Sequence, residues 1–293
     1  MNRNLDLAIT ALAPAIWGST YLITTEFLPD GYPLTVSMLR ALPAGLLLLL
    51  LVRKLPEGKW WGRVFLLGAL NFSIFWSLLF LAAYRLPGGV AATVGATQPL
   101  MVIFIARMAL GAPILPLSVG AALVGLGGVA LLILSPGAEW DMIGIVAGLG
   151  GAVSMAFGTV LSRKWQPPVS LLTFTAWQLT AGGLLLVPAA LWFEPPLPAL
   201  TGDNIFGFTY LGLIGAAFTY LLWFRGIAKL PSSLVASLGF LSPLTAVLLG
   251  WFVLGQHLNT QELTGVALVF GSVWLSQNAH RIKKPQVVKA PLN

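Results

Sequence analysis

The sequence contains no cysteine and very few charged residues. Without cysteine the chain can form neither a disulfide framework nor a thiolate metal site. Only 9% of its 293 residues are charged, whereas a soluble globular domain carries about 25%. The chain therefore has too little charge to cover a surface that faces water, and a soluble fold is excluded.

Apolar residues are abundant and occur in long runs. They make up 57% of the chain, and the mean hydropathy is +0.88. A helix needs about 20 mostly apolar residues to cross a bilayer, and the runs between charged or Pro/Gly-containing stretches are of this length. We therefore expect an all-α polytopic membrane protein with short connections and ten transmembrane helices. The predicted spans are 7–28, 33–52, 63–84, 88–109, 115–134, 142–162, 170–192, 204–224, 232–254 and 261–280.

The lysines and arginines fall almost entirely on one side of this arrangement. Basic residues remain on the cytoplasmic side of a membrane protein. With the N-terminus inside, fourteen of the sixteen are cytoplasmic, whereas Arg85 lies outside and Arg40 lies within the second span. The fourteen are Arg3, Arg53, Lys54, Lys59, Arg63, Arg107, Arg163, Lys164, Arg225, Lys229, Arg281, Lys283, Lys284 and Lys289. Both termini are predicted to be cytoplasmic, and the net charge of +7 reflects topology, so no nucleic-acid partner is expected.

One apolar segment bounded by prolines is written twice. LPGGVAATVGATQPL (86–100) and LPSSLVASLGFLSPL (230–244) share six of fifteen positions at an offset of 144. WGST at 17–20 echoes FGTV at 157–160 at an offset of 140, and Gly45 matches Gly183 at an offset of 138.

These echoes predict that one unit of five spans occurs twice. The first copy is residues 1–137 and the second is residues 138–280, followed by a basic cytoplasmic tail, 281–293. Because five is odd, the second copy enters the membrane from the opposite side. Inverted repeats of this kind are typical of transporters that work by alternating access.

The repeated segments also carry a family resemblance. PAIWGSTYL in the first span, Arg40, the segment 86–100 with its echo, and WQLTAGG (177–183) resemble the EamA-type drug/metabolite transporter superfamily. The aromatic-rich body is similar to its bacterial aromatic amino-acid exporters. The resemblance implies a secondary transporter of the bacterial inner membrane that exports amino acids, aromatic and other apolar ones, or related metabolites. It implies a small-molecule substrate, a lipid bilayer, no cofactor, no metal, and a monomer or weak dimer.

Pro99 and Pro243 lie in the repeated segments, near the middle of two predicted spans. A proline inside a helix removes the hydrogen bond to the carbonyl four residues earlier, which here belongs to Gly95 or Gly239. We interpret the prolines as gating kinks whose bare glycine carbonyls line a substrate cavity. The alternative is a kink that serves packing alone.

Arg40 is the basic residue that lies clearly within a span. An ionised side chain in the membrane is costly and usually marks a functional site or a water-filled cavity. Arg40 would bind a substrate carboxylate through two parallel hydrogen bonds. The alternative is that its side chain extends to the outer surface and pairs with Glu26. In the second copy the matching position holds Gln178, so the charge is not symmetric.

Aromatic and polar side chains inside the spans complete the predicted substrate site. Apolar pockets with a few polar groups are the usual form of small-molecule sites. Aromatic side chains that merely pack or face lipid are the alternative for each of them. The predicted substrate-binding residues are Trp17, Ser19, Tyr21, Arg40, Asn71, Trp76, Tyr84, Gly95, Gln98, Phe157, Trp177, Gln178, Tyr220, Gly239 and Ser242.

Three classes of function remain on the sequence alone. A secondary transporter is favoured by the inverted repeat, and drugs or other small metabolites are alternative substrates. A channel or facilitative carrier would need a constriction or filter that the sequence does not display. A membrane enzyme would need catalytic acids, clustered histidines or a nucleophile with its base. The two histidines lie at span ends, so no catalytic residue is predicted.

Overall fold

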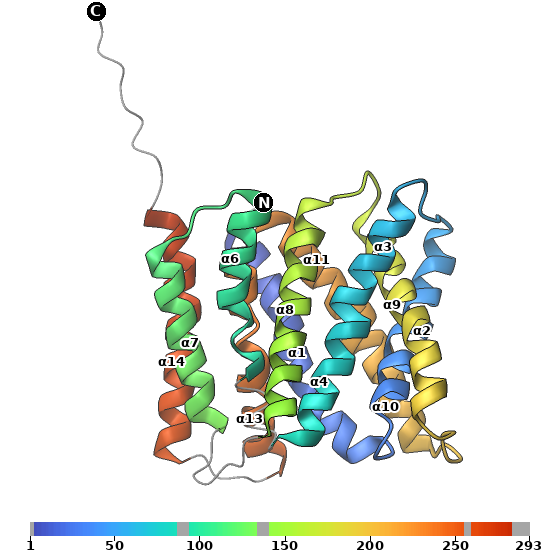
Figure 1. Ribbon diagram of the computed structural model, residues 1–293. Helices are drawn as coiled ribbons and strands as arrows, with labels where there is room; N and C mark the ends of the chain where they lie inside the picture. Colours follow the sequence, from blue (N-terminus) through green and yellow to red (C-terminus); the bar gives the residue numbers. More distant parts are fainter. Residues whose placement is uncertain (1–2, 87–93, 134–140, 255–258, 283–293) are drawn as a thin grey trace, which may run out of the picture.

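The computed structural model describes residues 3–86, 94–133, 141–254 and 259–282. All regular secondary structure in these residues is helical, and the helices stand side by side as one bundle (Figure 1). The start of α1 and the end of α14 lie at the same end of the bundle, which we call the N-terminal face (Figure 1). The predicted basic tail, 281–293, lies outside the described residues apart from Arg281 and Ile282.

Where the structure describes the chain, its helices lie near the predicted spans; residues 88–93 of the predicted span 88–109 lie outside the described residues. Among the described residues, seven segments are long and apolar enough to cross a membrane, and two further apolar helices, Gln98–Leu110 and Pro116–Leu131, are shorter. The chain is therefore a multi-pass membrane protein. The helices of the first half are α1 (Arg3–Phe27), α2 (Pro33–Val52), α3 (Trp60–Gly68), α4 (Ile74–Arg85), α6 (Gln98–Leu110) and α7 (Pro116–Ile133). Those of the second half are α8 (Met142–Lys164), α9 (Leu171–Phe193), α10 (Gly202–Gly212), α11 (Thr219–Lys229), α12 (Ser232–Leu238), α13 (Leu241–Leu254) and α14 (Thr260–Ile282).

A π-helical turn interrupts the helix in each half at the same place. Ala69–Ser73 joins α3 to α4, and Leu213–Phe218 joins α10 to α11. Their first residues are 144 apart, which is the offset of the repeated segment. A π-helical turn is wide, is rare within α-helices, and is often found at functional sites. The sequence analysis did not predict either turn.

The two prolines of the repeated segment were predicted to kink continuous helices, but each lies in the first turn of a helix instead. Pro99 is at the second position of α6, and Pro243 is at the third position of α13. Proline is tolerated in the first turn of a helix, where its missing N–H would lack an intrahelical partner anyway. The predicted spans are therefore broken just before the prolines, at 96–97 and at 239–240. The Gly239 carbonyl is not bare either, because the Ser242 N–H donates to it at 3.1 Å.

Helices α2 and α9 pack against each other along much of their length. Two glycines allow their backbones to touch. A methyl group on Gly45 would lie 2.8 Å from the carbonyl carbon of Leu179, and one on Gly183 would lie 2.6 Å from the Cα atom of Leu42. The two close approaches are equivalent, because Gly45 and Gly183 are 138 residues apart in the repeat. Small residues serve such close helix contacts in membranes.

Candidate functional site

Arg40 lies buried in the interior of the bundle. Its side chain extends from α2, and the residue is only 8% exposed. The Nη2 atom donates to the carbonyl oxygen of Gly215 at 2.8 Å, and the guanidinium lies 4.9 Å from the centre of the Trp76 ring. This placement does not fit the alternative in which the guanidinium reaches the outer surface.

The carbonyl of Gly215 is the acceptor around which this site is built. In addition to Arg40, it accepts from Nε1 of Trp17 at 3.2 Å and from Oγ1 of Thr219 at 2.8 Å. Trp17 also donates to Oγ1 of Thr219 at 2.9 Å. Gly215 belongs to the second π-helical turn and has no side chain, so donors from α1 and α2 can reach its backbone. The turn therefore brings the two halves of the chain together at Arg40.

Aromatic rings surround this polar centre. The Tyr220 ring is 4.6 Å from that of Phe72, 4.9 Å from that of Trp17 and 6.4 Å from that of Trp76, and Trp17 is 5.1 Å from Trp223. Ring centres at these separations are typical of favourable aromatic pairs. We call Trp17, Phe72, Trp76, Tyr220 and Trp223 the aromatic cluster. It encloses one permanent positive charge, which suits an anionic group on an apolar body.

A second buried polar group consists of Asn71, Ser162 and Gln178. Nδ2 of Asn71 donates to Oε1 of Gln178 at 2.9 Å and to Oγ of Ser162 at 3.2 Å. Asn71 and Gln178 are 0% exposed, and Asn71 Oδ1 and Gln178 Nε2 make no hydrogen bond within the described part of the chain. Buried polar atoms of this kind are expected to have partners. The group therefore offers one free acceptor and one free donor in the interior.

The two polar groups occupy matching positions in the two halves. Arg40 and Gln178 are 138 residues apart, and Asn71 and Gly215 are 144 apart, which are the two repeat offsets. Arg40 reaches the second π-helical turn from α2, and Gln178 reaches Asn71 of the first turn from α9. Each contact joins one half of the chain to the other.

Of the remaining predicted site residues, some make hydrogen bonds elsewhere in the bundle. Oγ of Ser19 is 2.7 Å from the Tyr210 hydroxyl, and Nε1 of Trp177 donates to the Lys54 carbonyl at 2.6 Å. Phe157 is 41% exposed on the outward side of α8, with Val146 and Val153, and its role in substrate binding stays a prediction. Its outward position follows from the rotation of α8, whose opposite face carries the small residues that pack inside.

The repeated segment contributes less to this centre than predicted. Among the polar groups there, Nε2 of Gln98 is buried with no hydrogen bond in the described residues, and the Gly95 Cα faces open space. Gly239 and Ser242 bond to each other through the backbone, and Gly18 of α1 packs against the Ser242 carbonyl. The side chains of Tyr21 and Tyr84 lie outside the described part of the structure.

Several contributors to the aromatic centre were not predicted. Phe72, Gly215, Thr219 and Trp223 were all missed. Phe72 could have been found by its spacing of four residues from Trp76, and Trp223 by its spacing of three residues from Tyr220, each on one helix face. The role of Gly215 depends on a carbonyl freed by a π-helical turn, which no side-chain pattern reveals.

Ionic and hydrogen-bonded contacts join the two halves at both ends of the bundle. At the N-terminal face, Asp6 of α1 is 2.5 Å from Nη2 of Arg225 and 3.8 Å from Nζ of Lys229. At the opposite end, the two carboxylate oxygens of Glu194 accept from the backbone N–H groups of Leu34 and Thr35 at 2.6 and 2.7 Å. Glu194 thereby satisfies free N–H groups at the start of α2, where a negative charge is favourable.

Comparison with known proteins agrees with this architecture. A model of the EamA-like transporter family matches residues 6–134 and again residues 142–277. Protein PecM of Dickeya dadantii (strain 3937) is 43% identical over 279 residues, which cover 94% of each chain. The uncharacterized inner membrane transporter YedA of Escherichia coli (strain K12) is 29% identical over 94% of this chain and 92% of its own.

A solved crystal structure has the same fold. It superposes with a TM-score of 0.83 at 20% sequence identity, over 97% of this chain and 100% of the other. At that identity the likeness concerns the fold alone. The two family matches, which together span most of the sequence, and the identity with PecM lead to one conclusion. The chain belongs to the EamA-like transporter family.

Proposed function

We propose that this protein is a secondary transporter that exports amino acids with aromatic or other apolar side chains, or related carboxylate metabolites. The observation that carries the proposal is the buried Arg40 guanidinium, held by the Gly215 carbonyl beneath the Trp76 ring. A carboxylate would meet this charge, and the apolar body of the substrate would lie against the aromatic cluster. Arginine suits this role because its planar fork matches a carboxylate with two hydrogen bonds.

Two inverted five-helix repeats, giving ten transmembrane helices, would supply the movement. The family model that matches twice, the two π-helical turns at one offset, and the equivalent contacts of Gly45 and Gly183 all support the duplication. Inverted repeats exchange conformations, so the outward-open and inward-open states are near mirror images of each other. Alternating access about a central Arg40 follows from this symmetry.

The proposed location is the bacterial inner membrane, with both termini in the cytoplasm. The similarity to YedA, an inner membrane transporter of Escherichia coli, supports the location. The distribution of basic residues supports the orientation. In this orientation the N-terminal face is cytoplasmic, and Glu194 lies at the periplasmic end.

The test is efflux from proteoliposomes that are preloaded with amino acids, cationic drugs or other metabolites. We expect saturable efflux of amino acids with apolar side chains and little efflux of cationic drugs. Arg40→Lys should slow this efflux strongly, because a point charge does not reproduce the two-point contact. Arg85→Lys is the matched control, since Arg85 is half-exposed and pairs with Asp141 at 3.6 Å.

Two results would contradict the proposal. Arg40→Lys that transports at the rate of the unmodified protein would remove Arg40 from substrate binding. Efflux that does not saturate would instead favour a channel-like carrier.

A further inference from the structure

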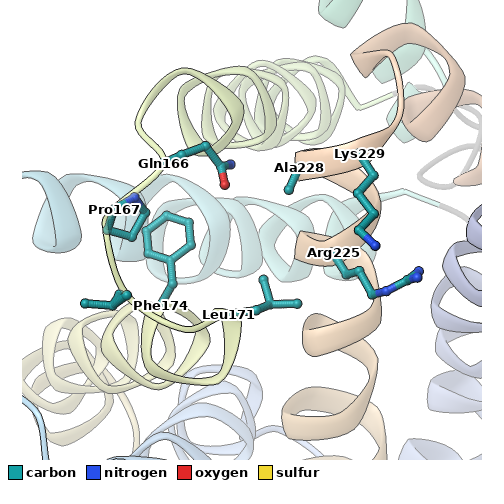
Figure 2. Close-up of a pocket in the computed structure, with 8 residues that line it drawn as sticks. Gln166, Pro167, Leu171, Phe174, Arg225, Ala228 and Lys229 are labelled. Carbon is teal, nitrogen blue, oxygen red and sulfur yellow. The ribbon is translucent and has the colours of Figure 1, made fainter. Parts of the chain in front are cut away.

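A cavity opens at the N-terminal face, away from the central Arg40. Figure 2 shows it between α11 on one side and α9 with the α8–α9 connection on the other. Its volume is about 160 Å³. Its walls are mostly apolar, with two cations and one amide. The lining residues are Gln166, Pro167, Val169, Leu171, Phe174, Arg225, Ala228 and Lys229.

Both cations of the cavity contact the same carboxylate. Arg225 and Lys229 lie 2.5 and 3.8 Å from Asp6 of α1. These three described side chains together carry two positive charges and one negative charge. A second anion would therefore be attracted, and it would compete with Asp6 for Arg225.

Aromatic rings lead from this cavity to the central site. The Phe174 ring, which lines the cavity, is 5.9 Å from that of Phe224, and Phe224 is 5.7 Å from Tyr220. Tyr220 belongs to the aromatic cluster around Arg40. Because Tyr220, Phe224 and Ala228 are four residues apart on α11, they lie on one helix face. The cavity wall at Ala228 is about 12 Å along the helix from Tyr220.

We propose that the cavity is a cytoplasmic entry site for the substrate, distinct from the central site and dependent on the proposed direction of transport. The substrate carboxylate binds Arg225 and Lys229 in place of Asp6, while the apolar body lies against Leu171 and Phe174. The volume suits a carboxylate and its first carbon atoms. The displacement of Asp6 also loosens the ionic contact between α1 and α11 on the side from which the substrate arrives.

The absence of native cysteine provides the test, because one introduced cysteine is then the sole thiol. Ala228→Cys places a thiol on the exposed cavity wall, and Glu57→Cys places one on the exposed α2–α3 loop at the same face. Each variant is reconstituted in phosphatidylcholine vesicles and labelled with a water-soluble thiol reagent. We expect L-phenylalanine to protect Ala228→Cys but not Glu57→Cys. L-phenylalaninol, which keeps the ring and amine but lacks the carboxylate, should not protect.

Two second-site substitutions test the charges. Asp6→Asn removes the competing carboxylate and should lower the half-protecting concentration of L-phenylalanine by about fivefold. Arg225→Gln should abolish protection. Each variant must elute as a monodisperse peak in detergent. If Arg225→Gln fails this control, Lys229→Ala is the milder variant, because it keeps Arg225 and its contact with Asp6. It should weaken protection without abolishing it.

Three results would overturn the proposal. The first is unchanged labelling of Ala228→Cys in the presence of L-phenylalanine. The second is equal protection by L-phenylalaninol, which would show that the carboxylate is not recognised. Protection by added phosphatidylglycerol alone would assign the cavity to a lipid headgroup. The outcome is separable from that of the central site, because protection in an Arg40→Lys background tests the entry site without requiring transport.

Discussion

The close contact of α2 with α9 predicts a specific cost for adding one methyl group. In Gly45→Ala the new methyl would meet the backbone of Leu179 and Thr180. Backbone atoms of a packed helix cannot rotate out of the way as a flexible side chain does. Overpacking costs about 1–3 kcal/mol, whereas replacing glycine by alanine within a helix returns up to about 1 kcal/mol. Because both methyl contacts are with backbone atoms, the cost lies toward the upper end of that range, and we expect a net loss of about 2 kcal/mol of stability.

Thermal unfolding in detergent measures this loss. A loss of that size should lower Tm by about 4 °C in a chain of this length. Gly183→Ala should cost a similar amount, because its methyl would lie 2.6 Å from the Leu42 Cα atom. The double variant should cost less than the sum, since both methyl groups widen one helix crossing.

The matched control is Gly120→Ala on α7. No atom lies within 4 Å of the position its methyl group would occupy. This variant should unfold at the same temperature as the unmodified protein or slightly higher, because alanine is the better helix former. If Gly45→Ala and Gly183→Ala have the same Tm as Gly120→Ala, the backbones of α2 and α9 do not touch, and the reasoning fails.

Three other predictions concern the orientation of the chain and the contacts between its two halves. A periplasm-specific reporter fused to the C-terminus should be silent, and activity there would reverse the proposed orientation. Gln178→Ala should lower the free energy of unfolding by about 1–3 kcal/mol, since it removes the nearer of the two acceptors of the buried Asn71 amide, which keeps the 3.2 Å contact with Oγ of Ser162; an unchanged Tm would contradict this. Glu194→Gln replaces one acceptor oxygen by an N–H₂ group, which would face one of the two N–H groups of Leu34 and Thr35 without accepting from it. It should increase thiol labelling of a cysteine at the adjacent Pro196, whereas Asp203→Asn, the control at the same end, should not.

The sequence predicted what depends on composition and periodicity. The apolar runs located α2 at the residues where it occurs, Pro33–Val52, because a bilayer fixes the length of a span. Arg40 was identified because an intramembrane charge is conspicuous in an apolar run. These inferences require only the order of residue types along the chain.

Other features depend on how the helices turn against one another. Phe157 matches Trp17 in the repeat, yet α8 presents it outward while α1 holds Trp17 against Tyr220. The Gly215 carbonyl accepts side-chain hydrogen bonds within a π-helical turn. A glycine in a sequence does not indicate that its carbonyl will be used in this way. Pro99 lies in the first turn of α6 rather than in the middle of a longer helix, and the choice between these outcomes depends on the packing of the neighbouring helices.

The glycine contact between α2 and α9 also has a mechanical consequence. The two backbones come closest where Gly45 and Gly183 meet the facing helix, and this region is a fulcrum about which α2 can tilt while the side chains packed along the rest of the interface shift. From Gly45 to the start of α2 at Pro33 is a lever of about 18 Å. A tilt of about 10° would displace that end by about 3 Å. This displacement is enough to break the bonds from Leu34 and Thr35 to Glu194, and it would move the other arm of α2 the opposite way.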